Sequence, residues 1–104
     1  GAHFRHRDEA SLFEQWLHRA IEDCLDVDLL IYQAGADPHV NDPLGKVLTG
    51  VQMAKRDHAV FSAFQGRPLV WNLAGGYQRD VNGGIEPVLK LHRTTAQIQN
   101  IYQP

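Results

Sequence analysis

The sequence predicts an α/β protein in which three helices alternate with two parallel strands in the order α-β-α-β-α. Two short apolar runs, residues 28–33 and 69–73, are each bounded by turn-forming residues. Such runs are typical of strands that are buried on both faces of a parallel sheet. Amphipathic stretches precede, separate and follow the two runs. A helix between two strands of one sheet normally makes a right-handed crossover, which leaves the strands parallel.

The first helix is expected from about Asp8 to Cys24, where apolar residues recur on one broad face. Asp8 can serve as its N-cap, and Ser11 with Glu14 can form a capping box instead. Cys24 lies on the apolar face and is interpreted as a buried, inert thiol.

The second helix is expected to begin near Thr49, whose spacing from Gln52 fits a capping box, and to stop at Gly66. Asp57 falls at the edge of the apolar stripe of this helix and is interpreted as a charge at the rim of the core. A final helix is expected with Pro87 in its first turn.

Composition limits the classes of function. The 104 residues form a single domain, with residues 1–7 interpreted as a tag remnant or a disordered lead. Ten basic and twelve acidic residues give a net charge of -2, which argues against binding to nucleic acid or to an anionic membrane surface. The one cysteine excludes an intrachain disulfide and favours a reducing compartment, so a cytoplasmic location is expected. No apolar run reaches membrane-spanning length.

Two strands alone make a poor sheet. An isolated pair is marginally stable, and both of its outer edges carry backbone groups that need partners. The chain is therefore expected to be part of a larger domain, with its sheet completed by association with itself or with other segments.

Polar residues follow both strands, in the loops where open parallel sheets keep their sites. Asp37, His39 and Asp42 follow the first strand, and Tyr77 follows Gly75-Gly76 after the second. A carboxylate with an imidazole suits zinc or another divalent metal, and a tyrosine hydroxyl can stabilise an oxyanion. The alternative is structural, since aspartate beside proline or glycine commonly bonds its own turn. The spacing alone favours turn structure for the two aspartates and leaves Tyr77 open between packing and chemistry.

Two motifs in these loops carry a resemblance. The segments AGADPHVNDPLG, residues 34–45, and LAGGY, residues 73–77, are separated by a helix. In this order and spacing, the chain resembles the C-terminal part of histone deacetylase family proteins, in particular bacterial deacetylase-like amidohydrolases of the arginase/deacetylase fold. The similarity covers residues 12–98. It implies that the chain is a C-terminal part of a three-layer fold, a partial domain whose missing N-terminal part would complete the sheet.

The resemblance also implies roles for individual residues. Asp37 matches a zinc ligand, and Tyr77 matches the tyrosine that polarises the substrate carbonyl, with Gly75 and Gly76 as the backbone that positions it. Residues 42–45 match a loop that shapes the site. Asp42 in this loop and His39 just before it are candidates for a supporting role. Lys46 stands where the pattern predicts another glycine. The family's other two zinc ligands and its paired histidines have no counterpart in this chain.

The sequence is therefore compatible with two functions. The chain is either a fragment of a zinc-dependent deacetylase-like amidohydrolase, inactive alone, or a non-catalytic α/β module. The module would self-associate as a homo-oligomer or bind a protein partner. The substrate is not indicated, because most of the residues that would line the pocket are absent.

Overall fold

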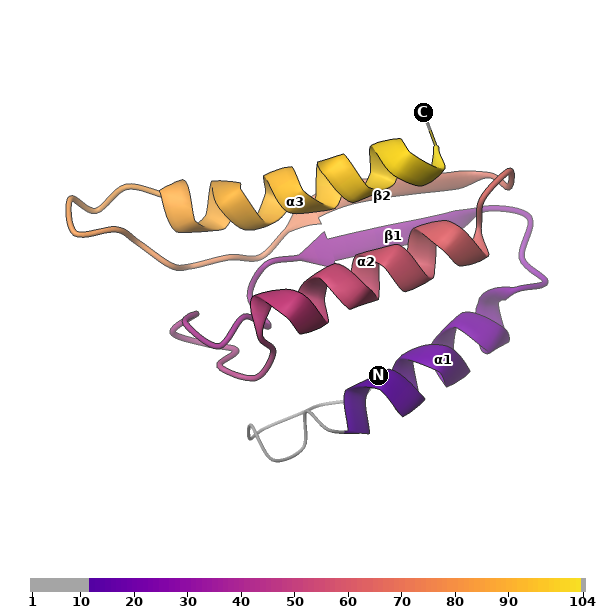
Figure 1. The fold of residues 1–104 in the computed structure, drawn as a ribbon, viewed down its shortest axis with the longest axis horizontal. Coiled ribbons are helices and arrows are strands. Elements are labelled where there is room, and N and C mark those ends of the chain that lie inside the picture. The colour runs from indigo at the N-terminus through magenta and orange to yellow at the C-terminus, as the bar shows by residue number, and fades with distance from the viewer. Residues whose placement is uncertain (1–11, 104) are drawn as a thin grey trace.

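The computed structural model describes residues 12–103 and has the predicted order of elements (Figure 1). The elements are α1 (Phe13–Cys24), β1 (Leu30–Gly35), α2 (Gly50–Ala63), β2 (Leu69–Ala74) and α3 (Glu86–Tyr102). β1 and β2 pair in parallel, with Leu30 opposite Leu69 and Gly35 opposite Ala74, so the predicted parallel pair is confirmed. Within residues 12–103 no helix combines the length and apolar character needed to cross a membrane.

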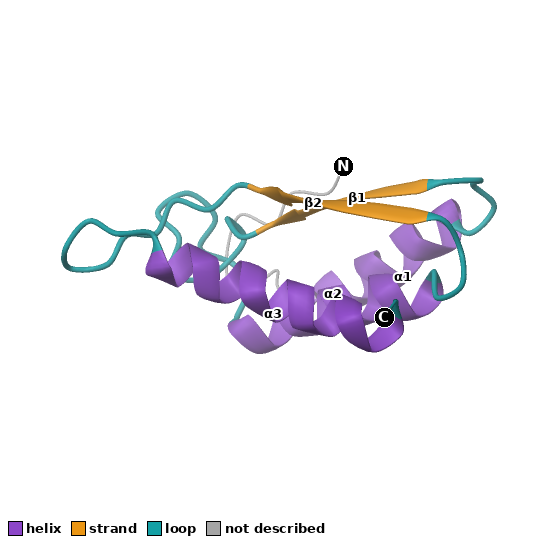
Figure 2. Cartoon of the chain, turned by 90° about the horizontal axis from the view of Figure 1, so that it is seen from above, coloured by secondary structure: helices purple, strands orange, loops and turns teal. Residues whose placement is uncertain are grey.

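All three helices lie on one face of the sheet (Figure 2). The opposite face carries Ile31 and Val70, whose exposed fractions are 70% and 55%. The prediction that the strands are buried on both faces is therefore wrong for this chain as the structure describes it. The apolar pattern is typical of two-sided burial, but the described helices cover only one side.

The local signals at the helix ends account for where α2 and α3 begin. Thr49 and Gln52 form the predicted capping box, in which each side chain accepts a hydrogen bond from the other residue's backbone N–H. Gly66 takes a left-handed conformation with φ of 76° shortly after α2 ends. Pro87 lies in the first turn of α3 as predicted. The predicted caps at Asp8 and Ser11 lie outside the described residues.

The core lies between the sheet and the helices. Phe61 of α2 is fully buried and packs edge-to-face against Tyr32 of β1 and against Trp71 of β2. Its ring therefore contacts both strands, so α2 packs against the whole two-stranded sheet. A cluster of six further buried side chains extends this core: Phe13, Leu17, Val47, Leu48, Met53 and Val60.

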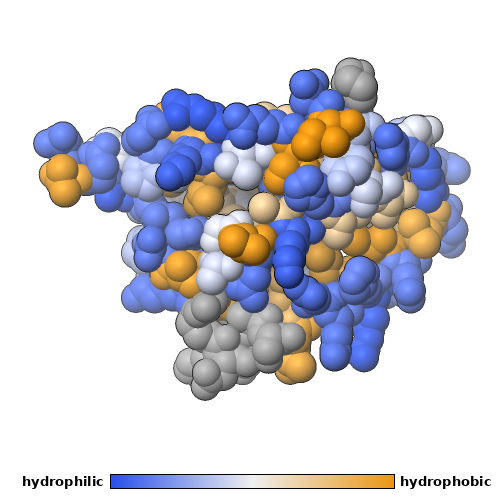
Figure 3. Space-filling model, in the orientation of Figure 1, coloured by the Kyte–Doolittle hydropathy of each residue, from blue (hydrophilic) through white to orange (hydrophobic). Residues whose placement is uncertain are grey.

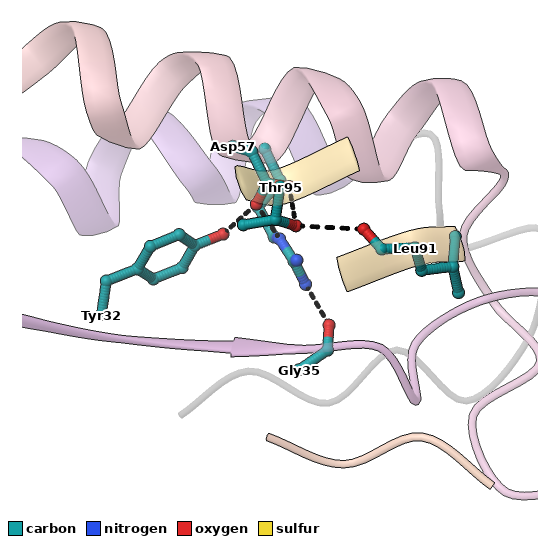
Figure 4. A network of polar contacts seen from close by, with 6 residues as sticks. Tyr32, Gly35, Asp57, Leu91 and Thr95 are labelled. Atoms are coloured by element: carbon teal, nitrogen blue, oxygen red, sulfur yellow. Dashed lines mark hydrogen bonds and ion pairs between the residues drawn. The ribbon is translucent and has the colours of Figure 1, made fainter. Parts of the chain in front are cut away.

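A buried polar network centred on Asp57 crosses the core (Figure 4). Asp57 is 1% exposed, so its interpretation as a rim charge is wrong. Its Oδ1 accepts hydrogen bonds from the Tyr32 hydroxyl and from Arg56 Nε, and its Oδ2 accepts one of 2.6 Å from the Thr95 hydroxyl. These donors come from β1, α2 and α3, so one carboxylate joins three elements.

Arg56 extends the network to the end of the first strand. Its Nη1 donates a 2.7 Å hydrogen bond to the carbonyl of Gly35, the last residue of β1. Its guanidinium also lies over the Tyr32 ring, 5.7 Å from the centroid. Burial raises the pKa of the Tyr32 hydroxyl far above its usual value, so this hydroxyl stays protonated and donates to Asp57.

Candidate functional site

The loops that follow β1 and β2 meet at the carboxyl end of the sheet. Asp42, in the loop after β1, accepts a 2.9 Å hydrogen bond on its Oδ2 from the backbone N–H of Tyr77, in the loop after β2. The two loops therefore face each other. Asp37, Asp42 and Tyr77 thus lie in the two loops at the edge where parallel sheets place their chemistry.

Asp37 lies over the ends of both strands. Its carboxylate fills the space beside Gly35 and Gly75, where a Cβ built on Gly75 would lie 2.5 Å from Asp37 Oδ1. Gly75 also has a φ of 49°, which favours glycine. Gly75 thus makes room for the Asp37 carboxylate two residues before Tyr77 in the chain.

Gly76 lets the chain pass close to the third helix. A Cβ at this position would lie 2.7 Å from Val88 of α3 and 3.2 Å from Ala36, and its φ is 122°. Tyr77 follows with an exposed side chain, while the next residue, Gln78, is buried. Glycine at both positions therefore lets the chain turn away from β2 and present Tyr77 at the surface.

Asp42 stabilises a turn, as predicted from the sequence, and also bonds to the loop after β2. Its Oδ1 accepts hydrogen bonds from the N–H groups of Leu44 and Gly45, at 2.8 and 3.3 Å. This is the local bonding expected of an aspartate in a turn. Because its other oxygen accepts from Tyr77, and because the residue is fully buried, Asp42 also links the two loops.

His39 does not join Asp37. Burial lowers the pKa of the His39 ring below its usual value, and the Asp42 carboxylate partly offsets this. The ring is therefore neutral near pH 7, and its Nδ1 accepts a 3.1 Å hydrogen bond from the Asn41 N–H. In this tautomer the proton lies on Nε2, and Nδ1 is engaged with the Asn41 N–H. His39 lines a cavity between α2 and α3, while Asp37 lines another beside α1.

The loop between Asp37 and α2 is closely packed on itself. A Cβ on Gly45 would lie 1.7 Å from the Asp37 carbonyl oxygen, so only glycine fits there. The next residue, Lys46, has a left-handed φ of 61°. A non-glycine residue pays roughly 1–2 kcal/mol for this conformation. The position where the resemblance predicts glycine is thus one where the backbone favours glycine.

A cavity of about 890 Å³ opens beside Asp37, between α1 and β1. Its walls are mostly apolar side chains of α1, α2 and β1, while Asp37, Gln33 and Arg56 add polar groups. Asp37 therefore lies where this largely apolar cavity meets the loops that follow β1 and β2.

The loop before α3 protrudes beyond this edge of the sheet and carries the fully exposed Val81. Figure 3 shows hydrophobic surface at that protruding end.

Sequence reasoning missed the role of Asp57 and Arg56. A signal was present, because Met53, Asp57, Val60 and Phe64 follow one another at spacings of three or four residues along α2. All of these side chains are buried. An acid at a core position of a helical pattern indicates a buried partner, and here the partners are Tyr32, Thr95 and Arg56.

Comparisons with known proteins add one relative. An uncharacterized protein from Picosynechococcus sp. is 32% identical in an alignment of 90 positions that covers 81% of this chain. The chain spans only 30% of the length of that relative. No family model matches the chain, and no solved structure matches it.

Proposed function

We propose that this chain is the C-terminal segment of a zinc-dependent amidohydrolase of the histone deacetylase family. In this proposal Asp37 is one zinc ligand, and Tyr77 donates its hydroxyl to the carbonyl oxygen of the substrate amide. The observation that carries the proposal is the convergence of the AGADPHVNDPLG and LAGGY loops at one sheet edge, with the Asp37 carboxylate seated against Gly75.

The residues of this chain do not form a zinc site by themselves. Among residues 12–103, no three histidine, cysteine or acidic side chains converge so that they could hold a metal ion. A catalytic zinc usually takes three protein ligands, and the His39 ring is occupied elsewhere. The remaining ligands would have to come from another segment or another chain, so the isolated chain is proposed to be inactive.

The role proposed for Tyr77 is that of a hydrogen-bond donor. A neutral phenol is a hydrogen-bond donor, and the negative charge that develops on a carbonyl oxygen under attack strengthens that bond. The exposed Tyr77 side chain is accessible to a substrate. Removing a donor of this kind typically costs a factor of about 10²–10³ in turnover.

Substitution of these two residues tests the proposal in the longest natural protein that contains this segment. Tyr77→Phe is expected to lower turnover of acetylated lysine peptides or acetylated polyamines by about 10²–10³ with unchanged zinc content. Asp37→Ala is expected to lose zinc and activity together. Metal analysis and steady-state kinetics measure both effects.

Tyr102→Phe is the matched control, because Tyr102 bonds His58 near the far end of α3. This control should leave turnover unchanged. Full turnover in Tyr77→Phe, or full zinc content in Asp37→Ala, would contradict the assignment. Without other segments, the isolated chain should bind far less than one zinc per molecule.

A second function, a non-catalytic module that self-associates, is favoured by the bare face of the sheet. Ile31 and Val70 lie opposite each other in the strand pairing, and both are exposed on the side that the helices of residues 12–103 leave uncovered. Paired apolar side chains on an uncovered sheet face are typical of an interaction surface.

Sedimentation of the isolated chain tests the second function. Dimers or larger oligomers are expected at micromolar concentration, and Ile31→Lys should shift the population to monomer. Val51→Lys is the matched control, because Val51 is equally exposed but lies in α2. A folded chain that stays monomeric at high concentration would contradict this function.

A further inference from the structure

The carboxylate of Asp42 links the two loops of the candidate site by hydrogen bonds. It is completely buried and accepts three backbone N–H groups, from Leu44, Gly45 and Tyr77. A second link, between Gln78 Nε2 and His39 Nδ1, is 3.4 Å long and correspondingly weak. The bond from Tyr77 to Asp42 is therefore the strong polar contact that fixes the backbone of Tyr77.

We propose that Asp42 is a positioning residue that sets the location of Tyr77 relative to Asp37. The inference that this location matters for turnover rests on the proposed function, while the structural tie does not. Hydrogen bonds to a carboxylate are stronger than those between neutral groups, and burial of Asp42 strengthens them further. Loss of this bond leaves the backbone N–H of Tyr77, which directly follows two glycines, without its carboxylate acceptor.

The same carboxylate also holds the other side of the site. Its Oδ1 fixes the N–H of Gly45, and the Cα of Gly45 lies directly against the Asp37 carbonyl. One oxygen of Asp42 therefore constrains the backbone beside Asp37, and the other constrains the backbone of Tyr77. The spacing between the two candidate residues depends on a group that touches neither of their functional atoms.

The pattern of donors makes Asp42→Asn a selective probe. An asparagine has the same shape but only one accepting oxygen. That oxygen satisfies most donors when it faces the N–H groups of Leu44 and Gly45, which directs the NH₂ group at the N–H of Tyr77. Two donors then oppose each other, so the turn is retained and the tie to Tyr77 is broken.

Asp80 offers a matched control in the neighbouring loop. Its Oδ1 alone accepts from both Asn82 and Gly84, so an asparagine can keep both hydrogen bonds through one oxygen. Asp80→Asn makes the same chemical change three residues beyond Tyr77. It should therefore leave the Tyr77 backbone unchanged.

The structural test is amide hydrogen exchange of the isolated full chain, followed by NMR. In Asp42→Asn we expect the Tyr77 amide to exchange at least about tenfold faster, while the Leu44 amide keeps its protection. Asp80→Asn should change neither rate. If Asp42→Asn does not fold, the hydrogen bond can be tested in the unsubstituted chain. The measurement is the NMR scalar coupling across this bond, between the Tyr77 nitrogen and the Asp42 carboxyl carbon. Unchanged Tyr77 exchange in the folded variant, or no such coupling, would overturn the tie.

The functional test uses the longest natural protein and the acetylated substrates named above. Asp42→Asn is expected to lower kcat by roughly 10–100-fold with little change in KM or zinc content, because a small misplacement of a catalytic group is costly. The double variant with Tyr77→Phe should be no slower than Tyr77→Phe alone. Additive losses, or normal kcat in Asp42→Asn when Tyr77→Phe is impaired, would overturn the positioning role. Normal turnover in Tyr77→Phe would instead refute the proposed function, and the exchange result would still decide the tie.

Discussion

Replacing Asp57 with alanine is expected to lower the free energy of unfolding by about 3–5 kcal/mol, the usual cost of removing one partner of a buried ion pair. The change leaves the Arg56 guanidinium, which is 11% exposed, without its carboxylate. It also leaves the hydroxyls of Tyr32 and Thr95 without their acceptor. Since small domains have a total stability of about 5–15 kcal/mol, this is a large share.

Urea unfolding followed by tryptophan fluorescence measures this effect. Trp71 reports on the core around the network because it packs against Phe61, which also contacts Tyr32. Asp23→Ala is the matched control, since Asp23 is exposed in the last turn of α1. The control should change stability by no more than about 0.5 kcal/mol. A similarly small loss for Asp57→Ala would show that the network does not stabilise the fold.

Gly45→Ala is expected to be comparably damaging, with a loss of about 3 kcal/mol, the upper end of the usual range for overpacking. The added Cβ would lie 1.7 Å from the Asp37 carbonyl oxygen and 2.9 Å from the Pro38 Cα. Both are backbone atoms, so no side-chain rotation relieves the clash and the whole loop must move. Thermal unfolding and the NMR shifts of the Asp37 loop measure the effect.

Gly66→Ala separates this clash from backbone strain. Gly66 has a left-handed φ of 76°, and nothing lies within 4 Å of its missing Cβ. Its replacement should cost only about 1–2 kcal/mol of strain. Equal losses in the two variants would indicate that the Gly45 loop adapts freely, contrary to the packing described above.

The parts of the fold that were predicted from the sequence depend on local chemistry. Thr49 and Gln52 cap a helix through residues three apart, and Pro87 fits a first turn because its own N–H is absent. The Asp57 network was missed because its partners, Tyr32 and Thr95, lie 25 and 38 residues away in the chain. No local pattern states which distant hydroxyls will meet a carboxylate.

The candidate site was predicted only in part, because its placement follows from local sequence while its hydrogen bonds join distant residues. Strand-end placement alone located Asp37, Asp42 and Tyr77 at one edge of the sheet. Whether Asp42 acts as a turn residue or as a link could not be read from its neighbours, since that depends on the Tyr77 N–H, 35 residues away. The tautomer of His39 likewise follows from the Asn41 N–H and from burial, which the spacing of the residues does not specify.

The parallel pairing of β1 and β2 also has a consequence for how the chain folds. Leu30 can pair with Leu69 only when the intervening loop and α2 have become compact. This contact therefore forms late, and closing the long loop costs conformational entropy. Until then both strands have unpaired backbone groups and apolar side chains such as Ile31 and Val70. Refolding therefore competes with association of unfinished chains, and the yield of native protein falls as the chain concentration during refolding rises.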